Sequence, residues 1–306
     1  MQEVTVQILM GVHEGGDHLE TQLQSFADQT HADWILLASD DSATDDSRAR
    51  IERFGAATPH PVQLFEGPRQ GFAANYLSLI PRAAPGWLAF SDQDDLWLPD
   101  KLARAVALLA AEPMDQPALY CARSTVWDGR VTHSSSPALP RAPGFQNALI
   151  ENIAQGNTIL LNPAATALAQ AAGPRVDRVF AHDWWLYLLI SGAGGRIVFD
   201  PGDPVVLYRQ HAGNAIGAGR GLRAQIARKT AVLRGAFAER LALNLAALEG
   251  CRDLLTPDNA ILLDRFSKGR TQGLPARVAA LRQLGLYRQR PLGTLGFWGA
   301  ALLGRI

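Results

Sequence analysis

Three aspartates within four positions, Asp92, Asp94 and Asp95, are the residues of this 306-residue sequence whose type and spacing point most directly to chemistry. Carboxylates held this close repel one another and lose hydration, and a bound cation offsets both effects. Oxygen ligands of this kind select Mg²⁺ or Mn²⁺, which usually complete their coordination with phosphate oxygens. The same cluster also suits a solvated turn, or a cap for a helix that starts near Pro99. The cluster by itself leaves both interpretations open.

A second acidic pair follows another apolar run. Asp40 and Asp41 come directly after residues 34–39, which are apolar throughout except for the last. Open α/β sheets bind ligands at the carboxyl ends of their strands, so residues just after a strand matter most. On its own, however, this pair fits a charged turn before a helix, because two more aspartates follow within five residues.

A third carboxylate, Asp183, opens an apolar stretch and is followed by Trp184 and Trp185. Residue type favours a helix cap here, with both tryptophans in the core. The role of Asp183 therefore depends on what lies beside it in the fold.

The elements that must position these aspartates follow from the hydrophobic pattern. Short apolar runs predict strands near residues 3–10, 34–39, 62–66 and 87–91, and amphipathic stretches predict helices near 18–28, 45–54 and 71–82. Such alternation predicts an α/β fold whose mostly parallel sheet is covered by helices. A hairpin of residues 118–126 with 130–133 is expected next, and residues 222–250 predict one long helix.

Composition and cysteine content exclude several classes of protein. Hydrophobic residues make up 47 % of the chain and charged residues 19 %, which is ordinary for a folded domain and not for a disordered chain. The two cysteines, Cys121 and Cys251, lie far apart, so neither a disulfide framework nor a zinc site is expected. The start of the chain lacks the pattern of a signal peptide, and the apolar stretch at residues 291–304 is shorter than the roughly 20 residues of a membrane-spanning helix. A cytoplasmic location is therefore expected.

Charge divides the chain into two unlike parts. Lys and Arg number 14 against 24 Asp and Glu over residues 1–214, but 15 against 5 over residues 215–306. We therefore expect an α/β domain over residues 1–215 and a basic helical region over residues 216–306. Basic helices that end in an apolar, Trp-containing segment fit attachment to an anionic membrane surface, while a solvated helical hairpin or an oligomer contact is the other interpretation. Nucleic-acid binding is disfavoured, because the basic residues are not interleaved with aromatics.

Three segments, 39–45, 67–75 and 90–101, resemble those of the family 2 glycosyltransferases in order and spacing. The run Asp-Gln-Asp-Asp at 92–95, followed by Trp and by Pro-Asp-Lys, is similar to that of the rhamnosyltransferase-like branch. The resemblance covers roughly residues 4–215 and implies the GT-A fold, a nucleotide-binding α/β sandwich, here with a helical C-terminal extension. It implies an inverting hexosyltransferase that moves a sugar from dTDP-rhamnose or a UDP-sugar to a hydroxyl of a glycan or lipid-linked acceptor.

The resemblance also assigns roles on the donor side. Asp94 is implied as a direct ligand of Mn²⁺ or Mg²⁺, Asp92 as a contact of the ribose, donor sugar or metal, and His211 as a ligand that closes over metal and diphosphate. Asp40 is implied to bond the nucleotide base. The remaining nucleotide-sugar contacts are implied at Val12, His13, Glu14, Arg69, Gly71, Asn75 and Arg209. His13 and Glu14 replace the commoner Tyr-Asn of the family, which leaves their base contact open, and Arg69 also fits a plain surface residue.

On the acceptor side the resemblance implies that Asp183 is the catalytic base, since the family carries an acidic residue at this helix start. Inverting transfer needs one carboxylate that takes the proton of the acceptor hydroxyl as its oxygen attacks the anomeric carbon. The helix N-terminus is expected to keep Asp183 ionised and to lower its pKa. Asn157, Trp184 and Trp185 are placed on the acceptor side, where the tryptophans either stack on a sugar or pack in the core.

The predicted function is thus a metal-dependent sugar transferase in cell-surface polysaccharide synthesis, peripheral on the inner face of the membrane. Two other classes of protein are also compatible with parts of the sequence. A homologue that binds a nucleotide-sugar without transferring it would have a buried, purely capping Asp183 with no open space before the metal site. A nucleotidyltransferase would carry Lys or Arg in the loop after the first strand, and residues 11–17 contain neither.

Overall fold

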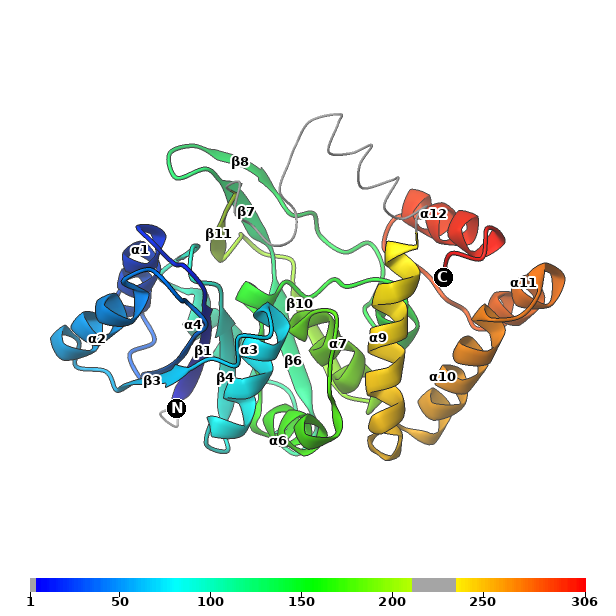
Figure 1. Cartoon of the computed structure of the whole chain (residues 1–306), viewed down its shortest axis with the longest axis horizontal. Coiled ribbons are helices and arrows are strands. Elements are labelled where there is room, and N and C mark those ends of the chain that lie inside the picture. The colour runs from blue at the N-terminus through cyan, green and yellow to red at the C-terminus, as the bar shows by residue number, and fades with distance from the viewer. Residues whose placement is uncertain (1–3, 211–234) are drawn as a thin grey trace.

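The computed structural model describes residues 4–210 and 235–306 and has a seven-stranded sheet at its centre (Figure 1). In spatial order the strands are β10 (Arg196–Asp200), β6 (Ala118–Ala122), β9 (Leu160–Leu161), β4 (Trp87–Ser91), β1 (Val6–Val12), β2 (Trp34–Asp40) and β3 (Val62–Glu66). Neighbours run parallel except at β9, which is antiparallel to β4 and β6. The four strands expected before residue 92 are all present, and the predicted α/β class is confirmed.

The strand register brings three chemically important loops to one edge of the sheet. Val12 at the end of β1 lies beside Asp40 at the end of β2, and Met10 lies beside Ser91 at the end of β4. Parallel strands place their carboxyl ends together, and this is the edge at which open α/β sheets bind ligands. The loops that begin at His13, at residue 41 and at residue 92 therefore meet.

Helices cover both faces of the sheet, because alternate residues of a strand point to opposite faces. Ile8 and Met10 belong to one core, shared with α1 (His18–Ala27), α2 (Ser47–Ala57) and α4 (Lys101–Leu109). Leu9 belongs to the other, shared with α3 (Phe72–Leu79), α5 (Phe145–Ala148), α6 (Pro163–Ala172) and α7 (His182–Gly192). Short 3₁₀ turns stand at Ile80–Arg82, Gly156–Thr158, Gly173–Arg175 and Arg252–Leu254. Helices packed on both faces of the sheet therefore support its carboxyl edge.

A second, four-stranded sheet has the order β5 (Leu96–Trp97), β11 (Val206–Arg209), β7 (Ser124–Trp127) and β8 (Thr132–Ser135). β7 and β8 pair antiparallel, as the expected hairpin requires. The prediction that its first arm starts at Ala118 is wrong. Residues 118–122 are fully buried and form β6 of the main sheet, and the chain changes sheets at Arg123.

Four helices follow residue 235, namely α9 (Ala236–Gly250), α10 (Pro257–Arg270), α11 (Leu274–Arg282) and α12 (Pro291–Leu302). Of the long helix expected over 222–250, α9 is the described part, since residues 211–234 lie outside the described residues. Leu241, Leu248 and Phe266 join the same core as α7, so these helices pack on the α/β domain. Within the described ranges, no helix has the length and apolar content needed to cross a bilayer.

Candidate functional site

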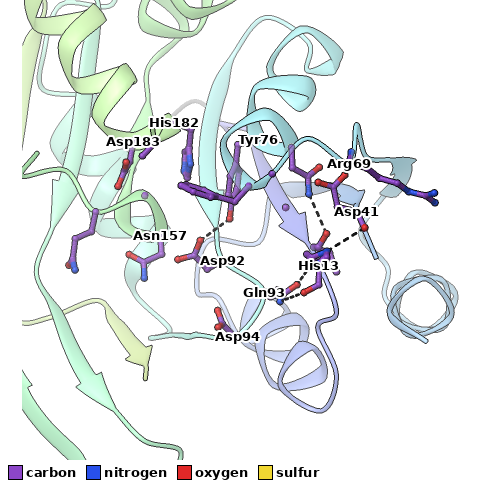
Figure 2. Close-up of a pocket in the computed structure, with 18 of the residues that line it drawn as sticks. His13, Asp41, Arg69, Tyr76, Asp92, Gln93, Asp94, Asn157, His182 and Asp183 are labelled. Atoms are coloured by element: carbon purple, nitrogen blue, oxygen red, sulfur yellow. Dashed lines mark hydrogen bonds between the residues drawn. The ribbon is translucent and has the colours of Figure 1, made fainter. Parts of the chain in front are cut away.

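A cavity of about 740 Å³ opens at the carboxyl edge of the main sheet. The loops after β1, β2 and β3 and the start of α3 form one side of it, and the 3₁₀ turn Gly156–Thr158 with the start of α7 forms the other. Figure 2 shows Asp92 between these two sides, with Asp183 and Asn157 to one side of it and His13 and Asp41 to the other. The site therefore has two halves that meet at Asp92.

Asp92 is held in place by Tyr76 of α3. The phenol hydroxyl donates to Asp92 Oδ1 at 2.8 Å and also lies 2.6 Å from the carbonyl oxygen of Ser91. Burial, together with the nearby carboxylates of Asp94 and Asp183, raises the pKa of Asp92 to about 7. A crowded carboxylate of this kind gains much from a bound cation, because the cation stabilises its ionised form.

Gln93 fixes the acidic loop to the loop after β1. Its side-chain oxygen accepts a hydrogen bond from the backbone N–H of His13 at 2.7 Å, and its amide nitrogen donates to the carbonyl of His13 at 2.8 Å. Asp92 and Asp94, the residues on either side, both line the cavity. The glutamine of the Asp-Gln-Asp-Asp run thus orients its neighbours through two reciprocal bonds.

Asp95, the last residue of that run, is completely buried and does not line the cavity. Its carboxylate accepts a hydrogen bond from the side-chain amide of Asn157 and another, 2.9 Å long, from the backbone N–H of Arg209. Burial raises the pKa of Asp95 well above its usual range, and the carboxylates of Asp92 and Asp94 raise it further. Asp95 connects the acidic loop to the 3₁₀ turn Gly156–Thr158 and to the end of β11.

Two carboxylates of the acidic loop, Asp92 and Asp94, line the cavity wall where a divalent cation would bind. Over residues 4–210 and 235–306, no group of three or more His, Cys, Asp or Glu side chains is arranged to hold a metal. A Mg²⁺ ion bound with phosphate groups typically takes only one or two protein carboxylates and completes its shell with water and phosphate oxygens. The pair fits a site of that type. His211, the further ligand implied by the sequence, lies outside the described residues.

Asp183 lines the cavity from the first turn of α7. Its Oδ1 accepts a hydrogen bond from the backbone N–H of Trp184 at 2.6 Å. Burial raises the pKa of Asp183 to about 6, although hydrogen bonds from Trp184, Asn152 and Gly156 act in the opposite direction. The expectation of a lowered pKa is therefore wrong, because lost hydration outweighs the helix N-terminus. A carboxylate with a pKa near 6 is mostly ionised at pH 7 and is a stronger base than an ordinary aspartate.

His182 forms a buried aromatic stack next to Asp183. Its ring centroid lies 3.8 Å from that of Tyr76 and 5.6 Å from that of Phe90. Both ring nitrogens are buried without a hydrogen-bond partner, and burial lowers the pKa of His182 to about 3, so the ring is neutral at pH 7. Gly156 leaves room for it, since a Cβ at that position would lie 2.7 Å from His182 Nε2.

The opposite half of the cavity is built on Asp41, Arg69 and Asn75. Asp41 Oδ1 accepts a hydrogen bond from the backbone N–H of Arg69 at 2.7 Å, and Arg69 adopts a left-handed φ of 55°. The side-chain amide of Asn75 donates to the carbonyl of Ser39 at 3.0 Å and to that of Val12 at 3.2 Å. These bonds tie the loop after β3 to Asp41, and helix α3 to the ends of β1 and β2.

Most of the predicted site residues lie in this one cavity. Those in its wall are Val12, His13, Arg69, Gly71, Asn75, Asp92, Asp94, Asn157 and Asp183. Those outside its wall are Glu14, Asp40, Trp184, Trp185 and Arg209. The loops expected to form the site thus meet at one cavity, and the roles predicted for their side chains stay predictions.

Two of the donor-side residues serve the loop after β2 and not the cavity wall. Asp40 accepts a hydrogen bond from the backbone N–H of Ser42 at 2.9 Å, and its neighbour Asp41 occupies the wall position. The exposed carboxylate of Glu14 accepts hydrogen bonds from the backbone N–H groups of Ala43 and Thr44 at 3.0 and 3.2 Å, which lower the pKa of Glu14. These carboxylates shape the loop from which Asp41 reaches the cavity.

Arg209 lies behind the acidic loop. Its Nε donates to the carbonyl oxygen of Asp94 at 2.7 Å, and its guanidinium lies 4.2 Å from the ring centroid of Trp127. Arg209 is therefore placed to orient the backbone of Asp94. It does not line the cavity, and the phosphate contact implied for it stays a prediction.

The two tryptophans after Asp183 belong to the core. Trp184 is 5 % exposed and its indole N–H donates to the carbonyl of Ala148 at 2.7 Å, while Trp185 is 1 % exposed. Neither lines the cavity, so the structure favours core packing over stacking on a sugar.

Sequence reasoning missed Tyr76, Gln93, His182 and Asp41 as site residues. All four stand next to predicted residues in the chain, at Asn75, Asp92, Asp183 and Asp40 respectively. Adjacency to a predicted site residue was the signal available for them. The stack between Tyr76 and His182 could not be predicted in this way, because it joins residues far apart in sequence.

The first half of the chain matches a known protein family. Residues 8–158 match the profile described as glycosyl transferase family 2. A dTDP-rhamnosyl transferase of Shigella flexneri is 24 % identical over 233 residues, which span 72 % of this chain and 77 % of that protein. A putative teichuronic acid biosynthesis glycosyltransferase of Bacillus subtilis is 25 % identical over 194 residues, which span 61 % of this chain and 73 % of that protein. The matched profile contains every cavity loop up to the 3₁₀ turn at residue 156.

A solved structure supports the fold. The mannosyltransferase of Pyrobaculum calidifontis in complex with GDP-Man and Mn²⁺ superimposes with a TM-score of 0.54 at 20 % sequence identity. The superposition covers 98 % of this chain and 85 % of that one, so it includes the helices α9 to α12 as well as the α/β domain.

Proposed function

The chain carries a glycosyl transferase family 2 domain in a GT-A fold, and on this premise we propose that it is an inverting transferase that uses a nucleotide-diphosphate sugar. The observation that carries the proposal is the placement of Asp183 and Asp92 on the wall of one cavity, with the loops of the family 2 profile around it. An inverting transfer needs a base for the acceptor hydroxyl and a group that stabilises charge on the departing diphosphate, which a carboxylate-bound cation supplies.

Asp183 is the proposed catalytic base. The acceptor hydroxyl oxygen attacks the anomeric carbon, and the proton of that hydroxyl passes to the Asp183 carboxylate. At the same time the bond between the anomeric carbon and the nucleotide diphosphate breaks. Because burial raises the pKa of Asp183 to about 6, the group is mostly ionised before transfer at pH 7 and holds the proton better than an exposed aspartate would.

Asp94 and Asp92 are the residues proposed to hold Mn²⁺ or Mg²⁺. When bound, such an ion neutralises charge on the departing diphosphate. The chain's own contribution is to position both carboxylates. The Tyr76 hydroxyl donates to Asp92, Arg209 donates to the backbone carbonyl of Asp94, and Gln93 between them donates to the backbone carbonyl of His13. The bound Mn²⁺ of the mannosyltransferase neighbour supports this proposal.

The nucleotide is proposed to lie in the half of the cavity formed by Asp41, Arg69, Gly71 and Asn75. The donor implied by the sequence and by the Shigella relative is dTDP-rhamnose, with UDP-sugars next. Asp41 and the backbone around Val12 offer hydrogen-bonding groups for a base, and exposed Arg69 offers a positive charge near the phosphates.

The acceptor is proposed to be a hydroxyl of a glycan or lipid-linked glycan in cell-surface polysaccharide synthesis, which the name of the Bacillus relative supports. An enzyme with such an acceptor works at the inner face of the cytoplasmic membrane. The net positive charge of residues 215–306 supports a peripheral location there.

The alternative of a non-catalytic sugar-nucleotide-binding homologue predicted an Asp183 that only caps its helix. Asp183 does accept a hydrogen bond from Trp184, but it also opens onto the cavity that contains Asp92, which favours the enzyme. Thermal-shift screening of dTDP-rhamnose, UDP-sugars and GDP-mannose with Mn²⁺, followed by nucleotide-diphosphate release with cell membranes as acceptor source, separates the two. Stabilisation by a donor without any release would support the non-catalytic homologue.

A further inference from the structure

Helix α12 presents a row of exposed leucines. Leu292, Leu295 and Leu302 are 81 %, 65 % and 53 % exposed, and Leu303, just after the helix, is 63 % exposed. Because residues three, four and seven positions apart share a helix face, Leu292, Leu295 and Leu302 lie on one side of α12. Single exposed leucines are common on protein surfaces, whereas an aligned row of them marks a contact surface.

The opposite side of α12 is anchored in the core. Phe297, Ala300 and Ala301 are 2 %, 6 % and 0 % exposed and belong to the same hydrophobic cluster as α7 and α9. The helix is therefore fixed to the protein by one face and offers the other to a partner. Its 12 residues contain no charged side chain.

The charge around this helix identifies the kind of partner. Residues 265–306 contain eight Lys and Arg and no Asp or Glu. Arg282, Arg290 and Arg305 are exposed on both flanks of α12, whereas Arg288 pairs with Glu151 at 3.3 Å. A surface that combines leucines with unbalanced positive charge complements anionic lipids, which supply both an apolar layer and negative headgroups.

Other partners fit this surface less well. A second copy of the chain would bring the same positive charges against these arginines, and like charges across an interface oppose association. The phosphates of a nucleic acid would neutralise the arginines but leave the leucines without an apolar partner.

We propose that the exposed face of α12 is a docking surface for an anionic bilayer, with the helix lying in the plane of the lipid headgroups. A helix of 12 residues is about 18 Å long, short of the roughly 30 Å of a hydrocarbon core, so it lies on the membrane and does not cross it. In Figure 1, α12 lies at the upper side of the helical extension, the side toward which the parallel strand β1 runs from the N-terminus. A membrane on that side would face the carboxyl edge of the sheet, where the cavity lies. The inference deepens the proposed function by placing a lipid-linked acceptor near the cavity, and only this role of the membrane contact rests on the proposed function.

Vesicle co-sedimentation of the full chain tests the proposal without any sugar transfer. Vesicles of phosphatidylcholine with 30 % phosphatidylglycerol are compared with phosphatidylcholine alone. We expect at least tenfold stronger binding to the anionic vesicles, and at least a tenfold loss in the triple variant Leu292→Ser, Leu295→Ser, Leu302→Ser. The charge variant Arg282→Glu, Arg290→Glu, Arg305→Glu should lose the preference for anionic vesicles.

The matched control replaces three exposed apolar residues of the α/β domain, Leu108→Ser, Met114→Ser and Val131→Ser, which are 40 %, 42 % and 58 % exposed. This variant should bind within twofold of the unmodified chain. Circular dichroism and thermal unfolding establish that each variant is folded. The proposal is overturned if the unmodified chain ignores anionic vesicles, if the leucine variant binds as well as the control, or if sedimentation without lipid shows a dimer that the leucine variant abolishes.

Failure here is distinguishable from failure of the proposed function. Asp183→Asn should bind vesicles like the unmodified chain, because Asp183 lies in the cavity and not on α12. Donor binding by the leucine variant should equally remain unchanged.

Discussion

The imidazole of His182 stacks on the phenol ring of Tyr76 with 3.8 Å between ring centroids, and the Tyr76 hydroxyl donates to Asp92 at 2.8 Å. This contact joins the first turn of α7, which carries Asp183, to the acidic loop after β4. The two carboxylates with different proposed roles are therefore held at a fixed separation by one buried aromatic pair.

Replacing Tyr76 by phenylalanine keeps the ring stack and removes the bond to Asp92. Loss of a residue that orients a metal-ligating side chain typically lowers metal affinity or activity by about 10- to 100-fold. We expect about a tenfold weaker affinity for Mn²⁺ in the presence of donor, measured by titration calorimetry, and a similar drop in turnover. Tyr120→Phe is the control, since it removes a buried hydroxyl bonded to Asp200 at 3.0 Å outside the cavity. Equal Mn²⁺ affinity in Tyr76→Phe and the unmodified chain would show that the hydroxyl does not position Asp92.

The pH dependence of turnover follows from the protonation of Asp183. Its pKa is raised to about 6 by burial, and only the ionised form can accept the proton of the acceptor. Turnover divided by KM should be level above pH 7 and fall about tenfold for each pH unit below 6. A profile that stays level down to pH 4.5, while donor binding persists, would exclude Asp183 as the base.

The same raised pKa of Asp183 predicts that folding stability falls as the pH rises, whereas turnover rises with pH. The folded protein holds a proton on Asp183 up to about pH 6, and the unfolded chain only up to the ordinary value of 3.8. The stabilising contribution of this proton is complete below pH 4 and is lost as the pH rises through 6. Asp183→Asn should therefore be more stable than the unmodified chain by about 1–3 kcal/mol at pH 8, with little difference at pH 4. Urea unfolding at both pH values measures this, and a less stable Asp183→Asn at pH 8 would identify a helix cap.

Gly156 is expected to tolerate no side chain. A Cβ there would lie 2.7 Å from Nε2 of His182, so Gly156→Ala must displace the ring that packs on Tyr76. Overpacking of this kind costs about 1–3 kcal/mol, and we expect that loss in thermal unfolding together with a drop in turnover of at least tenfold. Gly173→Ala is the matched control, because no atom lies within 4 Å of its added methyl group. Similar behaviour of the two variants would show that the position of His182 is unimportant.

Removal of divalent cations tests the proposed role of Asp92 and Asp94. Chelation by EDTA should abolish turnover, and Mn²⁺ or Mg²⁺ should restore it. Asp94→Asn should need a higher Mn²⁺ concentration than the unmodified chain to reach half of its maximal rate. Full turnover in EDTA would rule out the metal.

The sequence predicted the fold well because the signals that determine it are local. Alternating apolar runs identified β1 to β4, and the aspartates after β2 and β4 identified the edge at which the cavity lies. The pattern could not show that Asp41 lines the cavity and Asp40 does not, because neighbouring residues point in different directions and the backbone turn at Ser42, bonded to Asp40, decides which one faces the cavity. The raised pKa of Asp183 and the stack of His182 on Tyr76 depend on burial by distant segments, which no local pattern reports.

The most direct test of the central claim compares the unmodified chain with Asp183→Asn in sugar transfer. Labelled dTDP-rhamnose and UDP-sugars are incubated with Mn²⁺ and cell membranes, and incorporation, anomeric configuration of the new linkage and donor binding are measured in parallel. We predict transfer with inversion by the unmodified chain, and at least a hundredfold loss in Asp183→Asn with donor affinity unchanged, as removal of a general base typically costs about 10²- to 10⁴-fold. Equal transfer by both proteins, or retention of the donor's anomeric configuration, would contradict the account.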